Sequence, residues 1–103
     1  MRSFLVSYSD AANEDLRRAY RYIYTASTSS KTAQRYLNRV RRRCDNIGMA
    51  PYLGKDRSDL QPGIRSIPFE ASAEIFYFVD SEAVRIARVF FNGQDYERAL
   101  GGR

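Results

Sequence analysis

The stretch AEIFYFVDSEAVRIARVFF, residues 73–91, decides the fold of this 103-residue chain. It contains two runs rich in aromatic and β-branched residues, 73–79 and 83–91, and the residues DSE between them allow a tight connection. A third such run, 64–70, precedes them and is joined to them by EASA. The pattern predicts three consecutive strands in an antiparallel β-meander.

Neither face of these strands is cleanly polar, because successive side chains of a strand point to opposite faces. In the middle strand Phe76 and Phe78 lie opposite Ile75, Tyr77 and Val79. In the last strand strict alternation predicts two mixed faces: Arg88 with Val84, Ile86 and Phe90, and Arg85 with Ala87, Val89 and Phe91. One face can pack on helices, so the other is expected to be an open apolar surface that a second chain covers. The alternative is that the N-terminal strand, the preceding loop and the C-terminal turn fold over it.

The N-terminal half predicts a short strand, SFLVSY, and then two antiparallel helices. Asp10 is expected as the N-cap of a helix from about Ala11 to Ala26, and STSS at 27–30 separates it from the next helix. The apolar stripe of that second helix steps by four and three: Ala33, Leu37, Val40, Cys44 and Ile47. Gly48 is expected as the C′ residue of this helix and Pro51 as a stop.

The expected fold is therefore α+β, one domain over 1–103, with the helical hairpin packed on the meander. Residues 51–64 are expected to form an ordered loop. Near the C-terminus, DYERAL is expected to form a helical turn and GGR a frayed tail. Cys44 is expected in the core rather than as a nucleophile.

Composition restricts the chemistry available to the chain. There is no histidine and a single cysteine, which excludes Ser-His-Asp and Cys-His catalysis, clustered-cysteine zinc sites and an internal disulfide. We expect no metal and no cofactor. The longest apolar run, residues 75–79, is far shorter than the roughly 20 residues of a membrane-spanning helix. The charged Asp10 comes too early for a signal peptide, so we expect a cytoplasmic protein with no membrane partner.

Positive charge is concentrated in the first half of the chain. Residues 1–50 hold ten Lys and Arg against four Asp and Glu, whereas residues 51–103 hold seven against eight. On the second helix Lys31, Arg35, Arg39 and Arg42 lie opposite the apolar stripe. The pattern indicates either an acidic partner, nucleic acid or protein, or simply a solvated helix face.

Several short motifs occur in an order that resembles ParE, of the RelE/ParE toxin superfamily, over nearly the whole chain. They are Asp15-Leu16, Pro51-x-x-Gly54, Pro62-Gly63-Ile64-Arg65, Ile75-Phe76-Tyr77 and Arg88-Val89 followed by Gly93-x-Asp95. The resemblance implies the toxin of a bacterial toxin–antitoxin pair that poisons DNA gyrase without being an enzyme. It also implies a ParD-like ribbon-helix-helix antitoxin, through which operator DNA is contacted indirectly, and whose C-terminal segment wraps the toxin.

Two alternatives stay open. One is a RelE-type endonuclease that cleaves mRNA on the ribosome, for which Arg65, Lys55 and Arg57 would matter. The resemblance lines up the RelE catalytic positions with Glu74, Gln94 and the neighbourhood of Leu100, and its paired lysines with Arg65 and Ile67. Carboxylates repel a phosphodiester, so these residues disfavour RNA cleavage. The other alternative is a degenerate toxin that serves only as antitoxin partner and co-repressor.

The residues expected to bind antitoxin or target are Arg35, Arg39, Arg65, Phe76, Phe78, Arg85 and Arg88. The residues expected to be structural are Asp15, Leu16, Leu37, Val40, Cys44, Pro51, Gly54, Tyr77 and Asp95. For Arg65 a salt bridge to Asp59 or Glu74 is the competing interpretation. For Arg88 we favour an intramolecular pair with Asp15 or Asp95 over a contact with the antitoxin, because a buried guanidinium needs a partner.

Overall fold

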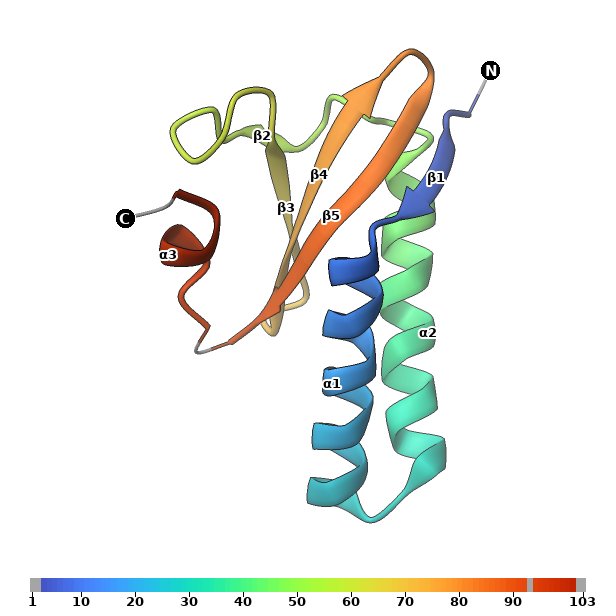
Figure 1. The fold of residues 1–103 in the computed structure, drawn as a ribbon. Coiled ribbons are helices and arrows are strands. Elements are labelled where there is room, and N and C mark those ends of the chain that lie inside the picture. The colour runs from blue at the N-terminus through green and yellow to red at the C-terminus, as the bar shows by residue number, and fades with distance from the viewer. Residues whose placement is uncertain (1–2, 93, 102–103) are drawn as a thin grey trace.

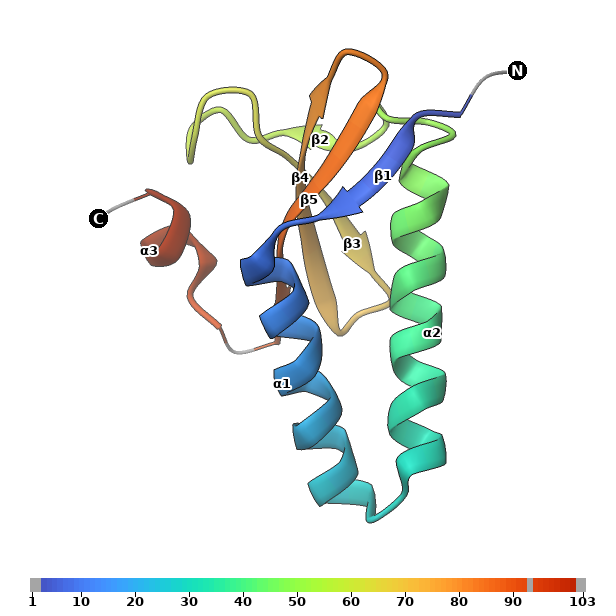
Figure 2. The same cartoon turned by 45° about the vertical axis from the view of Figure 1, so that its right-hand side comes forward.

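Two long helices cover one face of a five-stranded sheet in the computed structural model, which describes residues 3–92 and 94–101 (Figure 1). The elements are β1 (Leu5–Tyr8), α1 (Asp10–Ser27), α2 (Ser30–Ile47), β2 (Lys55–Asp56), β3 (Arg65–Phe69), β4 (Ala73–Asp80), β5 (Ala83–Phe91) and α3 (Tyr96–Gly101). The helical hairpin extends beyond one end of the sheet (Figure 2). Gly93 and the last two residues of the GGR tail lie outside the described residues.

The sheet order is β1-β5-β4-β3-β2. The antiparallel meander of β3, β4 and β5 is confirmed, and the two-residue strand β2 extends it within the expected loop. The sequence assigned no partner to the N-terminal strand, and the structure pairs β1 with β5 in parallel. A parallel neighbour requires a long crossover rather than a tight turn, and the sequence separating β1 from β5 contains both helices and the rest of the sheet.

Caps explain where the two long helices begin and end. Ser9, not the expected Asp10, caps α1: its Oγ accepts the backbone N–H of Ala12 at 3.0 Å. The left-handed Thr28 ends α1, and Ser29 caps α2. Gly48 directly follows the end of α2, as expected, but its φ is −61°, so a left-handed conformation is not the reason for glycine there. It is needed for space, since a Cβ there would lie 2.5 Å from the Phe4 carbonyl oxygen of the segment leading into β1.

The apolar stripes pack between the helices and the sheet, as predicted. Asp15, Leu16, Leu37, Val40, Cys44 and Tyr77 are all buried there or at its edge. No helix in residues 3–92 and 94–101 has the length and apolarity that crossing a bilayer demands.

A β-bulge in β5 corrects the predicted faces of the last strand. Ile86 is opposite Tyr77 and Arg88 is opposite Phe76, which leaves Ala87 as the extra residue. The inserted residue reverses the alternation, so the core face of β5 changes from even to odd positions. Val84, Ile86 and Val89 all join the core on the helix side, while Phe90 packs on the opposite face with Phe76.

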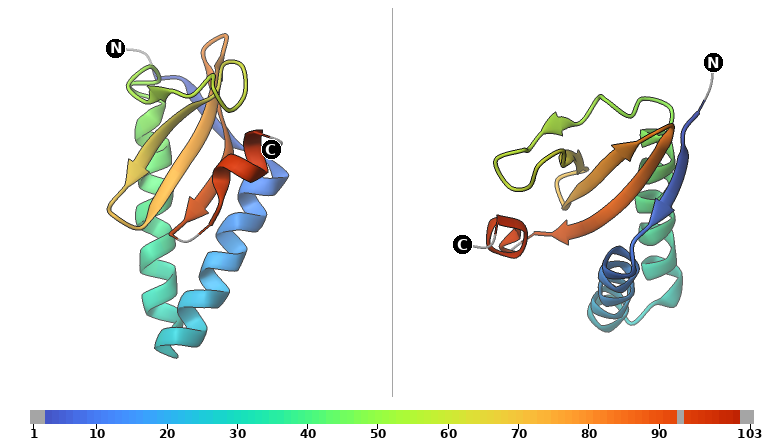
Figure 3. Two further views of the ribbon diagram at one scale, coloured as in Figure 1. Left: turned by 90° about the vertical axis from the view of Figure 1, so that its left-hand side faces the viewer. Right: turned by 45° about the horizontal axis from the view of Figure 1, so that its top comes forward.

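The opposite face of the sheet is covered by the chain itself. Ile64, Phe76 and Phe90 form a second cluster, which Leu60 of the 57–64 loop and Tyr96 and Leu100 of α3 close over. Figure 3 shows α3 on the side of the sheet away from the long helices. The expected open apolar surface is therefore wrong around Phe76, which is fully buried. The ring of Tyr96 in α3 covers Phe76, with the two ring centres 5.0 Å apart. The alternating pattern of the strands alone could not predict which segment would cover this face.

Candidate functional site

Asp15 joins α1 to the open edge of β5. β1 pairs with β5 only as far as Ile86, so the edge groups beyond it need other partners. Ser9 Oγ donates to the Ala87 carbonyl at 2.7 Å, and an Asp15 carboxylate oxygen accepts the Val89 N–H at 2.9 Å. A side chain from the helix thereby continues the hydrogen bonding that the short strand begins.

The same carboxylate holds Arg88. Arg88 Nε and Nη2 donate to the two oxygens of Asp15 at 2.8 and 2.9 Å, a two-point ion pair with the Asp15 side chain 3 % exposed. Asp15 raises the pKa of the Arg88 guanidinium. Of the two partners considered for Arg88, Asp15 is confirmed and Asp95 is wrong, because Asp95 accepts the backbone N–H of Arg98 at the start of α3. The guanidinium of Arg88 is thus engaged inside the chain.

Tyr77 fixes the turn that follows α2. Its hydroxyl donates to the Pro51 carbonyl at 2.8 Å and accepts the Gly54 N–H at 3.0 Å. A Cβ at Gly54 would collide with that hydroxyl, which explains why glycine is required there. Arg65 belongs to the same assembly: its Nη1 donates to the Gly54 carbonyl at 2.8 Å, and its guanidinium lies 5.2 Å from the centre of the Tyr52 ring. The expected salt bridges from Arg65 to Asp59 or Glu74 are wrong, since backbone carbonyls satisfy it instead.

The positions that the resemblance lines up with nuclease residues come together only in part. Glu74 and Gln94 line one pocket of about 270 Å³, to which Glu70 and Tyr96 also contribute, whereas Leu100 packs against the second cluster. Arg65 lies on the other face of the sheet from Glu74. Residues two apart on a strand share a face. Arg65 therefore shares the face of Ile67, which packs in the main core, whereas Glu74 shares the face of Phe76, which packs in the second cluster. Arg57 is turned to Asp59, at 3.0 Å, and to the Tyr96 ring. The pocket therefore places two carboxylates where a cleaved phosphate would need cations.

A larger groove lies between the two long helices and the end of β5. Its volume is about 650 Å³, and its lining is mostly apolar: Ala19, Tyr22, Ile23, Tyr36 and Phe91, with Thr32, Ser72, Asn92 and Gln94. Tyr22 is 75 % exposed at its rim. Two arginines complete the groove, Arg18 from α1 and Arg39 from α2. We call this the helix–sheet groove.

The charged rim of the helix–sheet groove is held by ion pairs. Arg39 Nε donates to Glu70 at 2.9 Å, and the carboxylate raises the pKa of the guanidinium. Arg18 lies 3.5 Å from Glu14. Burial raises the pKa of the Tyr36 hydroxyl, which is 2.7 Å from Ser72 Oγ and joins α2 to the β3–β4 turn. These contacts tie the lining of the groove to α2 and to the β3–β4 turn, while Tyr22 is exposed to a partner.

The structure does not gather the expected binding residues at one site. Arg39 is at the helix–sheet groove, and Arg35 is exposed on the solvent side of α2. Arg85 and the half-buried Phe78 pair on the outer face of the sheet, 5.1 Å from guanidinium to ring centre. Tyr22, Ile23 and Phe91 were missed as site residues. The spacing of Arg18 and Tyr22, one turn apart beside the apolar stripe, is the pattern that could have found them.

Comparison with known proteins gives concordant matches. The family described as the ParE toxin of the type II toxin–antitoxin system parDE matches residues 6–96. Toxin ParE3 of Caulobacter vibrioides is 31% identical over 87 residues, which cover 84% of this chain and 85% of that protein.

Two solved structures share the fold. One is from a chromosomal ParDE system of P. aeruginosa, with a TM-score of 0.73 and 17% identity over 86% of this chain and 96% of that one. The other is from the RelBE2 toxin–antitoxin complex of Mycobacterium tuberculosis, with a TM-score of 0.69 and 18% identity over 91% and 97%.

Proposed function

The chain belongs to the ParE toxin family of type II toxin–antitoxin systems, and on this basis we propose that it poisons DNA gyrase and is neutralised by a ParD-like antitoxin. The toxin holds gyrase on cleaved DNA and performs no chemistry of its own. The antitoxin is a ribbon-helix-helix dimer, so the operator sequence is recognised indirectly, through the antitoxin. Both proteins act in the cytoplasm, where gyrase works.

The observation that carries the antitoxin part of this proposal is the helix–sheet groove. Most of its exposed surface is apolar, and Tyr22 is exposed at its edge. An apolar groove of this kind fits the apolar face of an amphipathic helical segment. Acidic residues on that segment would meet Arg18 and Arg39 at the rim and compete with Glu14 and Glu70 for them.

The proposal that the chain is not a ribonuclease is supported by the pocket at Glu74. Glu70 and Glu74 supply negative charge there, and the nearby Gln94 is used by the fold, since its Oε1 accepts the Phe91 N–H at 2.6 Å. Transition-state stabilisation at a phosphate needs donors and cations aimed at the developing charge.

The gyrase part is tested with the purified chain, freed from antitoxin, in supercoiling and plasmid-cleavage assays. Cleaved plasmid should accumulate with gyrase and toxin together, and added antitoxin should abolish it. If gyrase is unaffected at toxin concentrations that saturate the antitoxin, the gyrase target is wrong. Cut mRNA on translating ribosomes would then favour the RelE-type alternative, and no activity in either assay would favour the degenerate toxin.

The groove is tested by two identical substitutions two residues apart on α1. Tyr22 lines the groove, whereas Tyr24 is 48 % exposed on the other side of the helix and stacks on Tyr20. Tyr22→Glu should raise the Kd for the antitoxin encoded beside this chain by at least about tenfold, roughly 1.4 kcal/mol. Tyr24→Glu should leave that Kd within about twofold. Equal effects of both substitutions would refute the groove as the docking site.

A further inference from the structure

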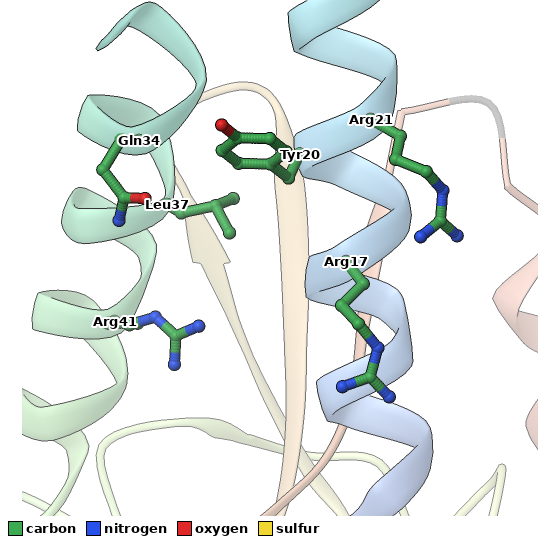
Figure 4. Close-up of a pocket in the computed structure, with 6 residues that line it drawn as sticks. All are labelled: Arg17, Tyr20, Arg21, Gln34, Leu37 and Arg41. Carbon is green, nitrogen blue, oxygen red and sulfur yellow. The ribbon is translucent and has the colours of Figure 1, made fainter. Parts of the chain in front are cut away.

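A second, smaller cleft opens between α1 and α2 on the side away from the sheet (Figure 4). Its volume is about 270 Å³, and its lining is strongly basic: Arg17, Tyr20, Arg21, Gln34, Leu37 and Arg41. Leu37, 5 % exposed, closes its floor, and the Tyr20 ring lies between the helices above it. Arg41 extends from α2 toward α1, whereas the Arg21 side chain is directed away from α2, so the arginines are spread across the outer surface of both helices.

The charges of this cleft are incompletely balanced. Glu14 accepts from Arg17 Nε at 3.0 Å and from Arg21 Nη2 at 3.2 Å, and these two arginines lower the pKa of its carboxyl. Arg41 makes no ion pair within the part of the chain that the structure describes. Glu14 is shared by Arg17, Arg18 and Arg21 and does not reach Arg41, so the cleft, whose own lining holds three arginines and no carboxylate, carries a net positive charge.

We propose that this cleft binds the phosphodiester backbone of duplex DNA, independently of the gyrase and antitoxin proposals. Planar guanidinium groups match the oxygens of a phosphate, and the Gln34 amide and Tyr20 hydroxyl are neutral donors of the kind that position a DNA backbone. Exposed Lys31, Arg35 and Arg42 continue the positive surface along α2. An acidic peptide is the less suitable ligand, because peptide grooves supply apolar anchor sites and the one aliphatic residue of this lining is almost fully covered.

The salt dependence of binding tests the number of phosphate contacts. If Arg17, Arg21 and Arg41 each neutralise one phosphate, affinity for a 20-base-pair duplex of arbitrary sequence should fall roughly 40-fold between 50 and 200 mM NaCl. The double substitution Arg17→Ala/Arg41→Ala leaves one contact, so its affinity should fall only about fourfold over the same range. Its affinity at 50 mM should be at least about tenfold below that of the unmodified chain.

Fluorescence anisotropy of a labelled duplex measures these values on the purified full chain. Arg98→Ala is the control for charge lost elsewhere: it removes one positive charge, where the double substitution removes two, from the exposed side of α3, beyond the other face of the sheet, and it should behave as the unmodified chain. Circular dichroism checks that the variants are folded. The proposal is overturned if the double variant keeps the affinity and salt slope of the unmodified chain, or if Arg98→Ala weakens binding equally. Tighter binding of a polyglutamate of equal charge than of the duplex would also overturn it and assign the cleft to an acidic peptide.

Discussion

Replacement of Asp15 by alanine should be among the most destabilising single changes in this protein. Asp15 accepts two hydrogen bonds from Arg88 and one from the Val89 N–H, and it joins α1 to β5 where β1 has ended. Without the carboxylate, the Arg88 guanidinium loses its counter-charge at a site where its side chain is only 26 % exposed. The Val89 N–H would also be buried without a partner.

The magnitude follows from these two losses. Breaking a buried ion pair by removing one partner costs about 3–5 kcal/mol, and an orphaned backbone N–H costs about 1–3 kcal/mol. Because Arg88 keeps some water and the two losses overlap, we expect roughly 3–4 kcal/mol in the free energy of unfolding. For a domain of 103 residues this lowers Tm by roughly 15 °C, using an unfolding entropy of about 2 cal/mol/K per residue.

Urea denaturation followed by circular dichroism measures this change, with Arg88→Ala and the double variant completing a cycle. The double variant lacks the unpaired charge, so its destabilisation should be about 2 kcal/mol less than the sum of the two single changes. Glu14→Ala, which removes the adjacent and exposed carboxylate of α1, is the control and should change stability much less. An Asp15→Ala variant within about 1 kcal/mol of the unmodified chain, or a strictly additive cycle, would refute the proposed role of the pair.

Three further changes test other parts of the structure. Tyr77→Phe removes the hydroxyl that holds the turn ending at Gly54 and should lower the free energy of unfolding, measured by urea denaturation, by about 1–3 kcal/mol. An unchanged unfolding transition would show that this hydroxyl does not stabilise the turn. Burial raises the pKa of the Cys44 thiol from 9.0 to about 11. The stabilisation that the neutral buried thiol gives to the folded state is therefore complete below pH 9 and is lost as pH rises through 11. Stability should therefore fall more steeply over that window, by up to roughly 2–3 kcal/mol, in the unmodified chain than in Cys44→Ala, and parallel curves would contradict this. Tyr96→Ala should uncover Phe76 and increase binding of a hydrophobic dye, whereas unchanged dye binding would show that α3 is not the cover.

Much of the candidate site follows from residue types that the sequence displays openly. The pairing of Arg88 with Asp15 could be anticipated because a guanidinium on an apolar strand requires a carboxylate, and Asp15 is the acidic residue beside Leu16 in the first helical stripe. For the helix–sheet groove the sequence offers only part of the signal. The spacing of Arg18 and Tyr22 marks one wall on α1, but Phe91 is far away in sequence, and no local pattern brings it beside Tyr22 and Ile23.

The sequence by itself determined the order and type of the main elements, because a helical stripe with steps of three and four and an alternating strand are local properties. Only the tertiary structure decided the parallel pairing of β1 with β5, the bulge at Ala87 and the cover over Phe76. Each of these depends on which distant segment fills a hydrogen-bonding edge or an apolar face. Periodicity shows that such an edge or face needs a partner, but the partner is selected by packing among segments that the pattern treats as equivalent.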